Sequence, residues 1–202
     1  MEGKSKVKVE DIKSAAEERR CPVQMALYYV EEFLKGPMCG RCYPCAFGSY
    51  EAKVRLLNIT EGEGDEKDIS ALKDIAENML LSSFCRKGKD TAKFLLEWMD
   101  RGLSQEHFDD KCHELECPAF VEYRVIPEKC ILCGLCKDEC RYNAIIGEKS
   151  AGFKTGYLPY EIRDRRCTCC GDCVDVCPTG AIVVIQRKTG EAVKGEEEAV
   201  AR

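Results

Sequence analysis

Residues 130–140 read CILCGLCKDEC, and residues 167–178 read CTCCGDCVDVCP. Both stretches place three cysteines at two-residue intervals and a fourth cysteine three residues further on. A short apolar run follows each one, AII at 144–146 and AIV at 181–183, so the chain contains an internal repeat. In this spacing three thiolates reach three corners of an iron–sulfur cube, whereas the fourth reaches the neighbouring cube. The repeat therefore predicts two 4Fe–4S clusters that exchange their fourth ligands.

The two predicted ligand sets each combine three cysteines of one copy with the last cysteine of the other. The first set is Cys130, Cys133, Cys136 and Cys177. The second set is Cys167, Cys170, Cys173 and Cys140. Zinc in both sets is the weaker alternative, because structural zinc favours four tetrahedral ligands that come as two pairs. Cys169 lies between two ligands and is predicted to be a spare thiol. Residues 120–187 resemble the bacterial two-cluster ferredoxin domain.

The composition is that of a globular metalloprotein. The chain has 202 residues, of which 16 are cysteine, with 33% charged residues and a formal net charge of −5. No apolar run is long enough to span a membrane, and no secretory signal opens the chain. An acidic chain is a poor match for a nucleic-acid backbone. We therefore expect a cytoplasmic protein whose clustered cysteines stay reduced and hold metal, without membrane or nucleic-acid partners.

A third cysteine motif occurs nearer the N-terminus. Residues 39–45 read CGRCYPC, and the next cysteine follows forty positions later, at Cys85. Apolar residues recur with a helical period from Val23, from Ala46, from Ile69 and from Ala92, which predicts four amphipathic helices around the motif. Pro44 suits the first turn of a helix, and the positive end of that helix favours a negatively charged cluster. A polar segment at 61–68 predicts a surface turn between the second and third helices.

Residues 18–187 resemble the iron–sulfur part of the NADH-oxidising flavoprotein subunits of respiratory complex I. They are more similar to the related subunits of electron-bifurcating hydrogenases and NAD-linked formate dehydrogenases, in which a two-cluster ferredoxin domain follows a cluster-binding helical bundle. The resemblance implies a third 4Fe–4S cluster, held by Cys39, Cys42, Cys45 and Cys85. Those relatives carry a flavin- and nicotinamide-binding domain before the bundle. Here about 20 residues precede it and no G-x-G-x-x-G motif follows a strand, so NADH oxidation is expected on another polypeptide.

Four cysteines lie outside these sets. Besides Cys169 they are Cys21, Cys112 and Cys117, and His113 directly follows the second of them. Three thiols and one imidazole form a closed ligand set that suits structural zinc. The resemblance implies such a zinc at the hinge between the bundle and the ferredoxin domain. His107 competes with His113 as the nitrogen ligand, and ordinary unmetallated thiols are the alternative.

These patterns predict an α+β chain with a small four-helix bundle that holds one 4Fe–4S cluster, followed by a bacterial two-[4Fe–4S] ferredoxin-like domain. The expected boundaries are a charged tail at 1–20, the bundle at 21–103, a linker that would carry the zinc hinge at 104–119, the ferredoxin domain at 120–187 and a tail at 188–202.

The expected function is that of a non-catalytic electron-transfer subunit in a cytoplasmic, anaerobic oxidoreductase complex, for which electron bifurcation is one option. The expected partners are a flavin subunit that oxidises NADH or NADPH, and ferredoxin or a catalytic subunit. The catalytic subunit could be a hydrogenase, a formate dehydrogenase or a tungsten or molybdenum aldehyde oxidoreductase. A zinc-binding scaffold without a redox role and a free polyferredoxin remain as alternatives.

Overall fold

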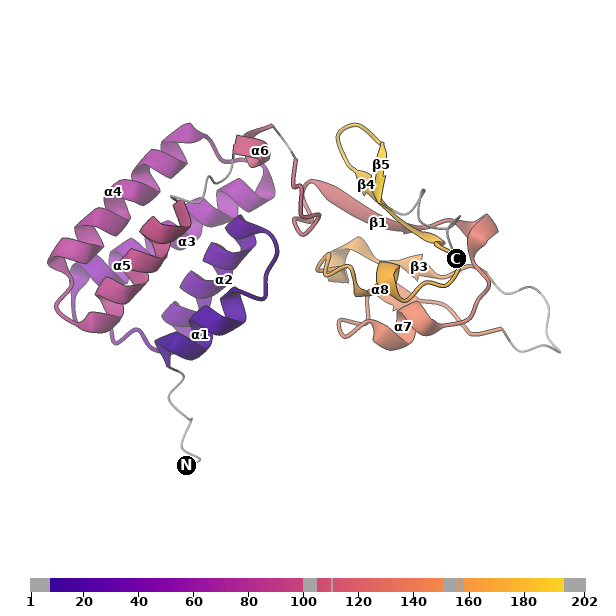
Figure 1. Cartoon of the computed structure of the whole chain (residues 1–202), viewed down its shortest axis with the longest axis horizontal. Helices are drawn as coiled ribbons and strands as arrows, with labels where there is room; N and C mark the ends of the chain where they lie inside the picture. Colours follow the sequence, from indigo (N-terminus) through magenta and orange to yellow (C-terminus); the bar gives the residue numbers. More distant parts are fainter. Residues whose placement is uncertain (1–7, 100–104, 110, 151–155, 157, 195–202) are drawn as a thin grey trace, which may run out of the picture. The chain divides into compact units, whose positions relative to one another are not determined.

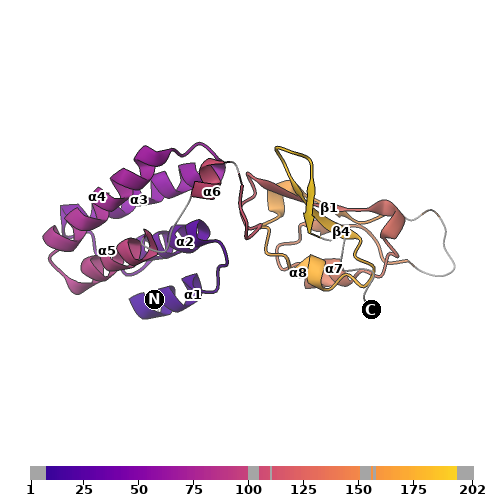
Figure 2. The ribbon, with the colours of Figure 1, turned by 45° about the horizontal axis from the view of Figure 1, so that its top comes forward.

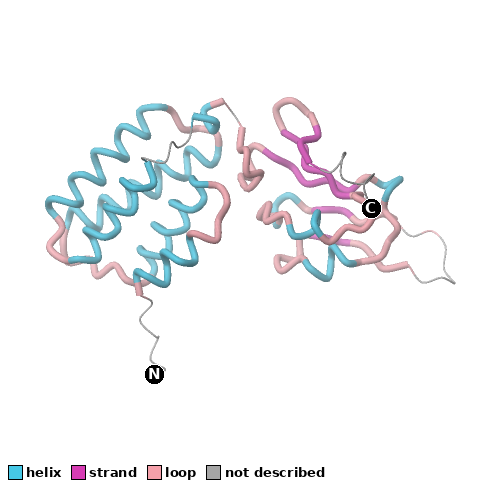
Figure 3. Tube along the Cα trace, in the orientation of Figure 1, coloured by secondary structure: helices cyan, strands magenta, loops and turns pink. Residues whose placement is uncertain are grey.

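The computed structural model describes residues 8–99, 105–109, 111–150, 156 and 158–194. The chain divides into unit 1, which ends at His113, and unit 2, which begins at Glu114. Unit 1 is helical and unit 2 contains the strands (Figure 3). This mixed α+β organisation is the one that the sequence predicts.

Unit 1 contains six helices within the described residues (Figure 1). They are α1 (Val9–Ala16), α2 (Pro22–Lys35), α3 (Tyr43–Glu61), α4 (Glu66–Ser82), α5 (Arg86–Met99) and α6 (Gln105–Phe108). Helices α2 to α5 contain the four predicted apolar stripes. Helix α1 lies within the stretch expected to be a charged tail, yet its Ile12 and Ala16 are buried and it packs on α2.

Local sequence explains where α3 ends and α4 begins. Gly62 adopts the left-handed conformation, with φ of 79°, that commonly terminates a helix. Asp65 then accepts hydrogen bonds from the backbone amides of Lys67 and Asp68 and so caps α4. Asp68 is itself buried, and its carboxylate pairs with Arg55 at 2.8 Å. The predicted turn at 61–68 is therefore shorter than expected, because its last three residues belong to α4.

The core of unit 1 joins helices that are distant in sequence. Tyr29 of α2 stacks on Phe94 of α5, with ring centroids 3.9 Å apart. Leu56, Leu72 and Leu95 bring α3, α4 and α5 into the same interior and are all fully buried. Burial of each such side chain contributes about 1.5–3 kcal/mol.

The helices of unit 1 run so that its predicted metal sites fall at opposite ends of α2. The indole of Trp98, near the end of α5, donates a hydrogen bond to the carbonyl of Pro22 at the start of α2. At the other end, Lys87 near the start of α5 donates to the carbonyl of Pro37, just after α2, at 3.4 Å. This second end, where α2 and α4 finish and α3 and α5 begin, is called the cysteine end below (Figure 2). The fourteen residues of α2 make a helix about 21 Å long, and this length separates its two ends.

Unit 2 is built around an antiparallel sheet in the order β1-β4-β5 and a two-stranded β2-β3 ladder. The strands are β1 (Val121–Val125), β2 (Ile145–Ile146), β3 (Glu161–Ile162), β4 (Ile182–Gln186) and β5 (Ala192–Lys194). Strand β1 pairs with β4 from Val121↔Gln186 to Val125↔Ile182. Strands β2 and β4 begin just after the two cysteine runs, as the apolar segments of the repeat predict.

The two cysteine runs share one backbone conformation. Each contains a short helix, α7 (Leu135–Glu139) in the first copy and α8 (Asp172–Asp175) in the second. Left-handed φ values occur at equivalent positions, 57° at Leu132 and 55° at Cys169, and again at the glycines that precede the two helices. Left-handed backbone is uncommon for residues other than glycine. The repeat in sequence is thus a repeat in structure.

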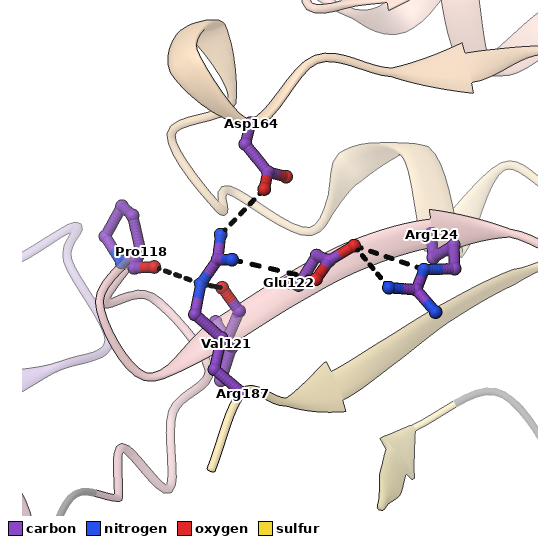
Figure 4. A network of polar contacts seen from close by, with 6 residues as sticks. All are labelled: Pro118, Val121, Glu122, Arg124, Asp164 and Arg187. Atoms are coloured by element: carbon purple, nitrogen blue, oxygen red, sulfur yellow. Dashed lines mark hydrogen bonds and ion pairs between the residues drawn. The ribbon is translucent and has the colours of Figure 1, made fainter. Parts of the chain in front are cut away.

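An arginine fixes the segment that leads into the second run (Figure 4). The Arg187 Nε donates to the carbonyls of Pro118 at 2.8 Å and Val121 at 3.1 Å. Its Nη2 donates to the Asp164 carboxylate at 3.0 Å. Asp164 begins the short 3-10 helix η2 (Asp164–Arg166), which ends directly before Cys167. Arg187 therefore holds the approach to that cysteine against the edge of the sheet. A second 3-10 helix, η1 (Pro127–Lys129), precedes Cys130 in the same way.

Candidate iron–sulfur and zinc sites

Two small cavities of similar size lie beside the cysteine runs of unit 2. The cysteines that line the first are Cys140, Cys167, Cys170 and Cys173. Those that line the second are Cys130, Cys133, Cys136 and Cys177. Each cavity thus receives three cysteines from one run and one from the other, which is the grouping that the spacing predicts.

Backbone amides point at the two exchanged sulfurs. The amide of Ala144 donates to Cys140 Sγ at 3.3 Å, and the amide of Ala181 donates to Cys177 Sγ at 3.2 Å. Both amides lie four residues after their cysteine, at the start of the strand that follows. Such hydrogen bonds stabilise a thiolate and orient it toward a metal. In each cavity one backbone amide is therefore placed to stabilise a negatively charged cysteine sulfur.

Burial keeps the inner cysteines protonated in the metal-free protein. It raises the pKa of Cys136 to about 11 and that of Cys173 to about 12, and neighbouring thiols add to both shifts. Metal ligands must be deprotonated, so metal binding at either site releases protons. Cys136 is among the neighbours that raise the pKa of Cys173. The two cavities consequently lie close to each other, along the contact between α7 and α8.

Cys169 is buried and its thiol hydrogen-bonds to Cys167. This bond is the main reason why the pKa of Cys167 is lowered to about 7, and it raises the pKa of Cys169 itself. The position was predicted to hold a spare thiol. Its equivalent in the first copy is Leu132, which can donate no such bond.

We expect the Cys169→Ala variant to keep all its iron but to lower the reduction potential of the neighbouring cluster. Donation to a ligand thiolate favours the more negative, reduced state, and one hydrogen bond contributes about 1 kcal/mol, or about 40 mV for one electron. Redox titration followed by electron paramagnetic resonance measures the shift. Leu132→Ala is the matched control and should leave the other potential unchanged. Loss of iron in Cys169→Ala would instead identify Cys169 as a ligand.

The third group of cysteines converges at the cysteine end of unit 1. Burial raises the pKa of Cys45 to about 11, and nearby Cys42, Cys85 and Cys39 contribute to the shift. Cys42 and Cys45 pack against Phe33 of α2. The structure therefore brings together all four cysteines of the predicted third set, with Cys39 on the exposed side.

An unsatisfied hydroxyl supports a metal cluster at this place. Ser83 is buried, and its Oγ has no hydrogen-bond partner in the described part of the protein. A buried donor without a partner costs about 1–3 kcal/mol. A Cβ at Gly88 would meet Ser83 Oγ at 2.8 Å and Cys45 Sγ at 3.1 Å, so the hydroxyl and the sulfur pack at the same point. Cluster or ligand sulfur would supply the missing acceptor.

We expect the Gly88→Ala variant to lose iron from the cluster of unit 1. A methyl group on Gly88 would push against Cys45 Sγ and the Ser83 side chain. A loss of iron would be informative, because replacing glycine by alanine within a helix otherwise stabilises the helix by about 1 kcal/mol. Iron analysis of the purified protein measures the loss.

Gly48→Ala is the matched control for this substitution. Its Cβ would meet the flexible thioether of Met79, at 2.6 Å from Sδ, rather than a cysteine. This variant should keep its iron. Equal iron in Gly88→Ala and the unsubstituted protein would contradict the role assigned to Gly88.

A fourth group has the ligands expected of a zinc site. The ligand atoms of Cys21, His107, Cys112 and Cys117 all lie within 4.8 Å of one another, and all four residues are buried. Cys21 Sγ lies 3.4 Å from His107 Nε2. His113, the predicted nitrogen ligand, is exposed and stands outside the group. The prediction of His113 is corrected to His107, because the short helix α6 directs the earlier histidine to the sulfurs.

Two family models match the chain, one in each unit. Residues 25–110 match the NADH-ubiquinone oxidoreductase-F iron-sulfur binding region, and residues 122–181 match the 4Fe-4S dicluster domain. The chain therefore combines an iron–sulfur binding region of the NADH-ubiquinone oxidoreductase F type with a dicluster ferredoxin domain.

Several curated proteins are similar to parts of the chain. The chain is 33% identical over 136 residues to the HndC subunit of the NADP-reducing hydrogenase of Solidesulfovibrio fructosivorans, covering 66% of this chain and 28% of the relative. It is 36% identical over 76 residues to the F subunit of the NADH-quinone oxidoreductase of Streptomyces coelicolor, covering 38% and 17%. It is 33% identical over 75 residues to the beta subunit of the NADP(+)-dependent formate dehydrogenase of Moorella thermoacetica, covering 37% and 11%. The chain thus spans less than a third of each of these relatives.

Proposed function

We propose that this chain is an electron-transfer subunit of an NADH- or NADP-linked oxidoreductase complex, and that it holds three 4Fe–4S clusters. The observation that carries the proposal is the crossed lining of the two cavities in unit 2, each with three cysteines from one run and one from the other. The convergence of four cysteines in unit 1 supports the third cluster.

Bound 4Fe–4S clusters supply one-electron transfer, with potentials set by charge, hydrogen bonds and exposure. The residues of this chain hold each cluster with four thiolates, which leaves no open coordination position for a reactant. The backbone amides of Ala144 and Ala181 donate hydrogen bonds that stabilise two of the thiolates. The subunit is thus non-catalytic and relays electrons.

The partners belong to the same proposal. The relatives are subunits of an NADP-reducing hydrogenase, an NADH-quinone oxidoreductase and an NADP(+)-dependent formate dehydrogenase. We infer a partner subunit that binds flavin and oxidises NADH or NADPH. At the other end of the relay we infer ferredoxin, a hydrogenase, a formate dehydrogenase or a tungsten or molybdenum aldehyde oxidoreductase. Electron bifurcation and a cytoplasmic, anaerobic setting complete the proposal. Within the described residues no helix is both long and apolar enough to cross a bilayer.

We also propose one structural zinc ion, held by Cys21, His107, Cys112 and Cys117. Three thiolates and one imidazole match a closed, tetrahedral zinc site. All four ligand residues are buried and their ligand atoms lie within 4.8 Å of one another, which is the compact arrangement that a structural zinc ion needs.

Metal analysis of anaerobically purified protein tests the proposal. We expect about twelve irons, about twelve labile sulfides and about one zinc per chain, with a brown colour that dithionite bleaches. A colourless protein with zinc alone would favour the non-redox scaffold, which no feature of the relatives supports. Purification of the native complex, with identification of the associated subunits, tests the partners and excludes a free polyferredoxin.

A further inference from the structure

Large apolar side chains are exposed at the cysteine end of unit 1. On α3 these are Tyr43, Phe47 and Tyr50, with 71%, 58% and 62% of their surface exposed. Tyr43 and Phe47 stack with their centroids 4.1 Å apart, and Tyr50 continues the same helix face. Near the end of α4, Leu81 and Phe84 are 81% and 86% exposed. These five residues are called the aromatic surface below.

The exposed apolar area of the aromatic surface is comparable to the largest apolar patch of a typical monomer, which is often a functional site. Each aromatic side chain offers about 150–250 Å² for burial, so the exposed fractions of the four aromatic residues amount to roughly 400–700 Å², to which Leu81 adds. The largest apolar patch of a typical monomer is about 300–600 Å², and larger patches mark interaction sites. The area is about that of one side of a small protein–protein interface.

The surface lies next to the predicted cluster ligands. Tyr43 directly follows Cys42, and Phe84 directly precedes Cys85. Cys39 is itself exposed at this end. A protein that docked here would bring its own cofactor close to the cluster of unit 1.

The charges around the aromatic surface are mainly positive, although the chain as a whole carries a formal charge of −5. Arg41, Arg86, Lys87 and Lys89 are the basic residues there. Of the acidic groups nearby in sequence, Asp90 pairs with Arg86 at 3.3 Å, and Glu32 pairs with Lys35 at 2.8 Å. In the two segments that carry the cysteines, 36–45 and 83–90, four basic residues therefore stand against one acidic residue, Asp90. A partner with a carboxylate-rich rim around an apolar centre would complement both features.

From these observations we infer that the aromatic surface, with its basic rim, is the docking site of a small acidic one-electron carrier protein of the ferredoxin class. The inference rests on the proposed function and specifies where an electron enters or leaves the relay. Opposite charges speed the encounter, and the aromatic side chains supply the contact area.

The test uses the full holoprotein and, as probe, an acidic plant-type [2Fe–2S] ferredoxin. Binding of the oxidised probe is measured by isothermal titration calorimetry, and reduction of the clusters by the reduced probe is measured by stopped flow. Two double variants remove the two features separately, namely Phe47→Ser with Phe84→Ser, and Arg86→Glu with Lys89→Glu. We expect each to weaken binding about tenfold or more, because central aromatic and charged contacts dominate such interfaces. Raised salt should weaken wild-type binding and affect the charge variant little.

Two control variants make the same kinds of substitution at positions outside the aromatic surface. Lys67→Glu with Lys73→Glu makes the same charge change on exposed positions of α4, and Leu158→Ser removes an apolar side chain that is 79% exposed in unit 2. Both should bind the probe like the unsubstituted protein.

Three outcomes would overturn the inference. These are no binding of the probe by the unsubstituted protein, equal losses in the controls, or a dimer that the aromatic variants convert to monomers, which would make the surface a self-interface. Dithionite separates this failure from failure of the proposed function. If dithionite bleaches the protein while the probe does not bind, only the docking site is wrong, whereas a protein that dithionite does not bleach rejects both.

Discussion

The Cys140→Ala variant should lose the cluster of the other cysteine run and keep the cluster of its own. Cys140 lines the cavity that also contains Cys167, Cys170 and Cys173. Without it that cluster has three thiolates instead of four, and we expect the iron content to fall from about twelve to about eight per chain. Total iron alone cannot tell the crossed arrangement from an uncrossed one, since either arrangement loses one cluster.

Protection of thiols from alkylation distinguishes the two arrangements. A cysteine bound to iron does not react, whereas one released from a lost cluster does. After treatment of Cys140→Ala with iodoacetamide under argon, peptide mass spectrometry should find label on Cys167, Cys170 and Cys173. Label on Cys130, Cys133 and Cys136 instead would refute the crossing. The mirror variant Cys177→Ala should give the reverse pattern.

The second large effect is expected at the proposed zinc site. His107→Ala removes the only nitrogen of the group of four and leaves three buried cysteines. Structural zinc contributes about 10–16 kcal/mol to the folding of small domains, so loss of one ligand should lower the free energy of unfolding of the protein by several kcal/mol. We expect bound zinc to fall from about one per chain to near zero, with iron unchanged.

His113→Ala is the control that the chain itself provides. His113 lies six residues further on, is exposed and stands outside the group. Its replacement should leave zinc content and thermal unfolding unchanged. Zinc loss in His113→Ala but not in His107→Ala would reverse the assignment, and equal zinc in both variants would reject a histidine ligand.

The sequence predicts the crossed grouping of the cysteines because that grouping follows from the number of residues between successive cysteines. Three thiols at two-residue intervals can bind one cluster, whereas a fourth cysteine three residues further on is too far from that cluster to bind it. The four longer helices were predictable for a similar reason, since their buried residues recur with the helical period. Both features leave a regular spacing in the sequence, although the crossed grouping is completed by contact between the two runs.

Features that depend on distant contacts were not predictable. Helix α1 lies in a charged segment, and only its packing on α2 buries Ile12 and Ala16. The choice between His107 and His113 depends on α6 and not on distance along the chain from Cys112. Gly88 looks ordinary in sequence, yet it packs against a cysteine from another helix. No pattern in the sequence identifies such pairs.

The crossed lining of the two cavities also affects how unit 2 unfolds. Each half of the repeat supplies a cysteine to the cavity of the other, so with the two proposed clusters bound neither half could open without breaking the coordination of both. Opening of α7 or of α8 alone is thereby suppressed, and the two halves melt in one cooperative transition. We therefore expect the proposed clusters to join the two copies of the repeat into a single folding unit.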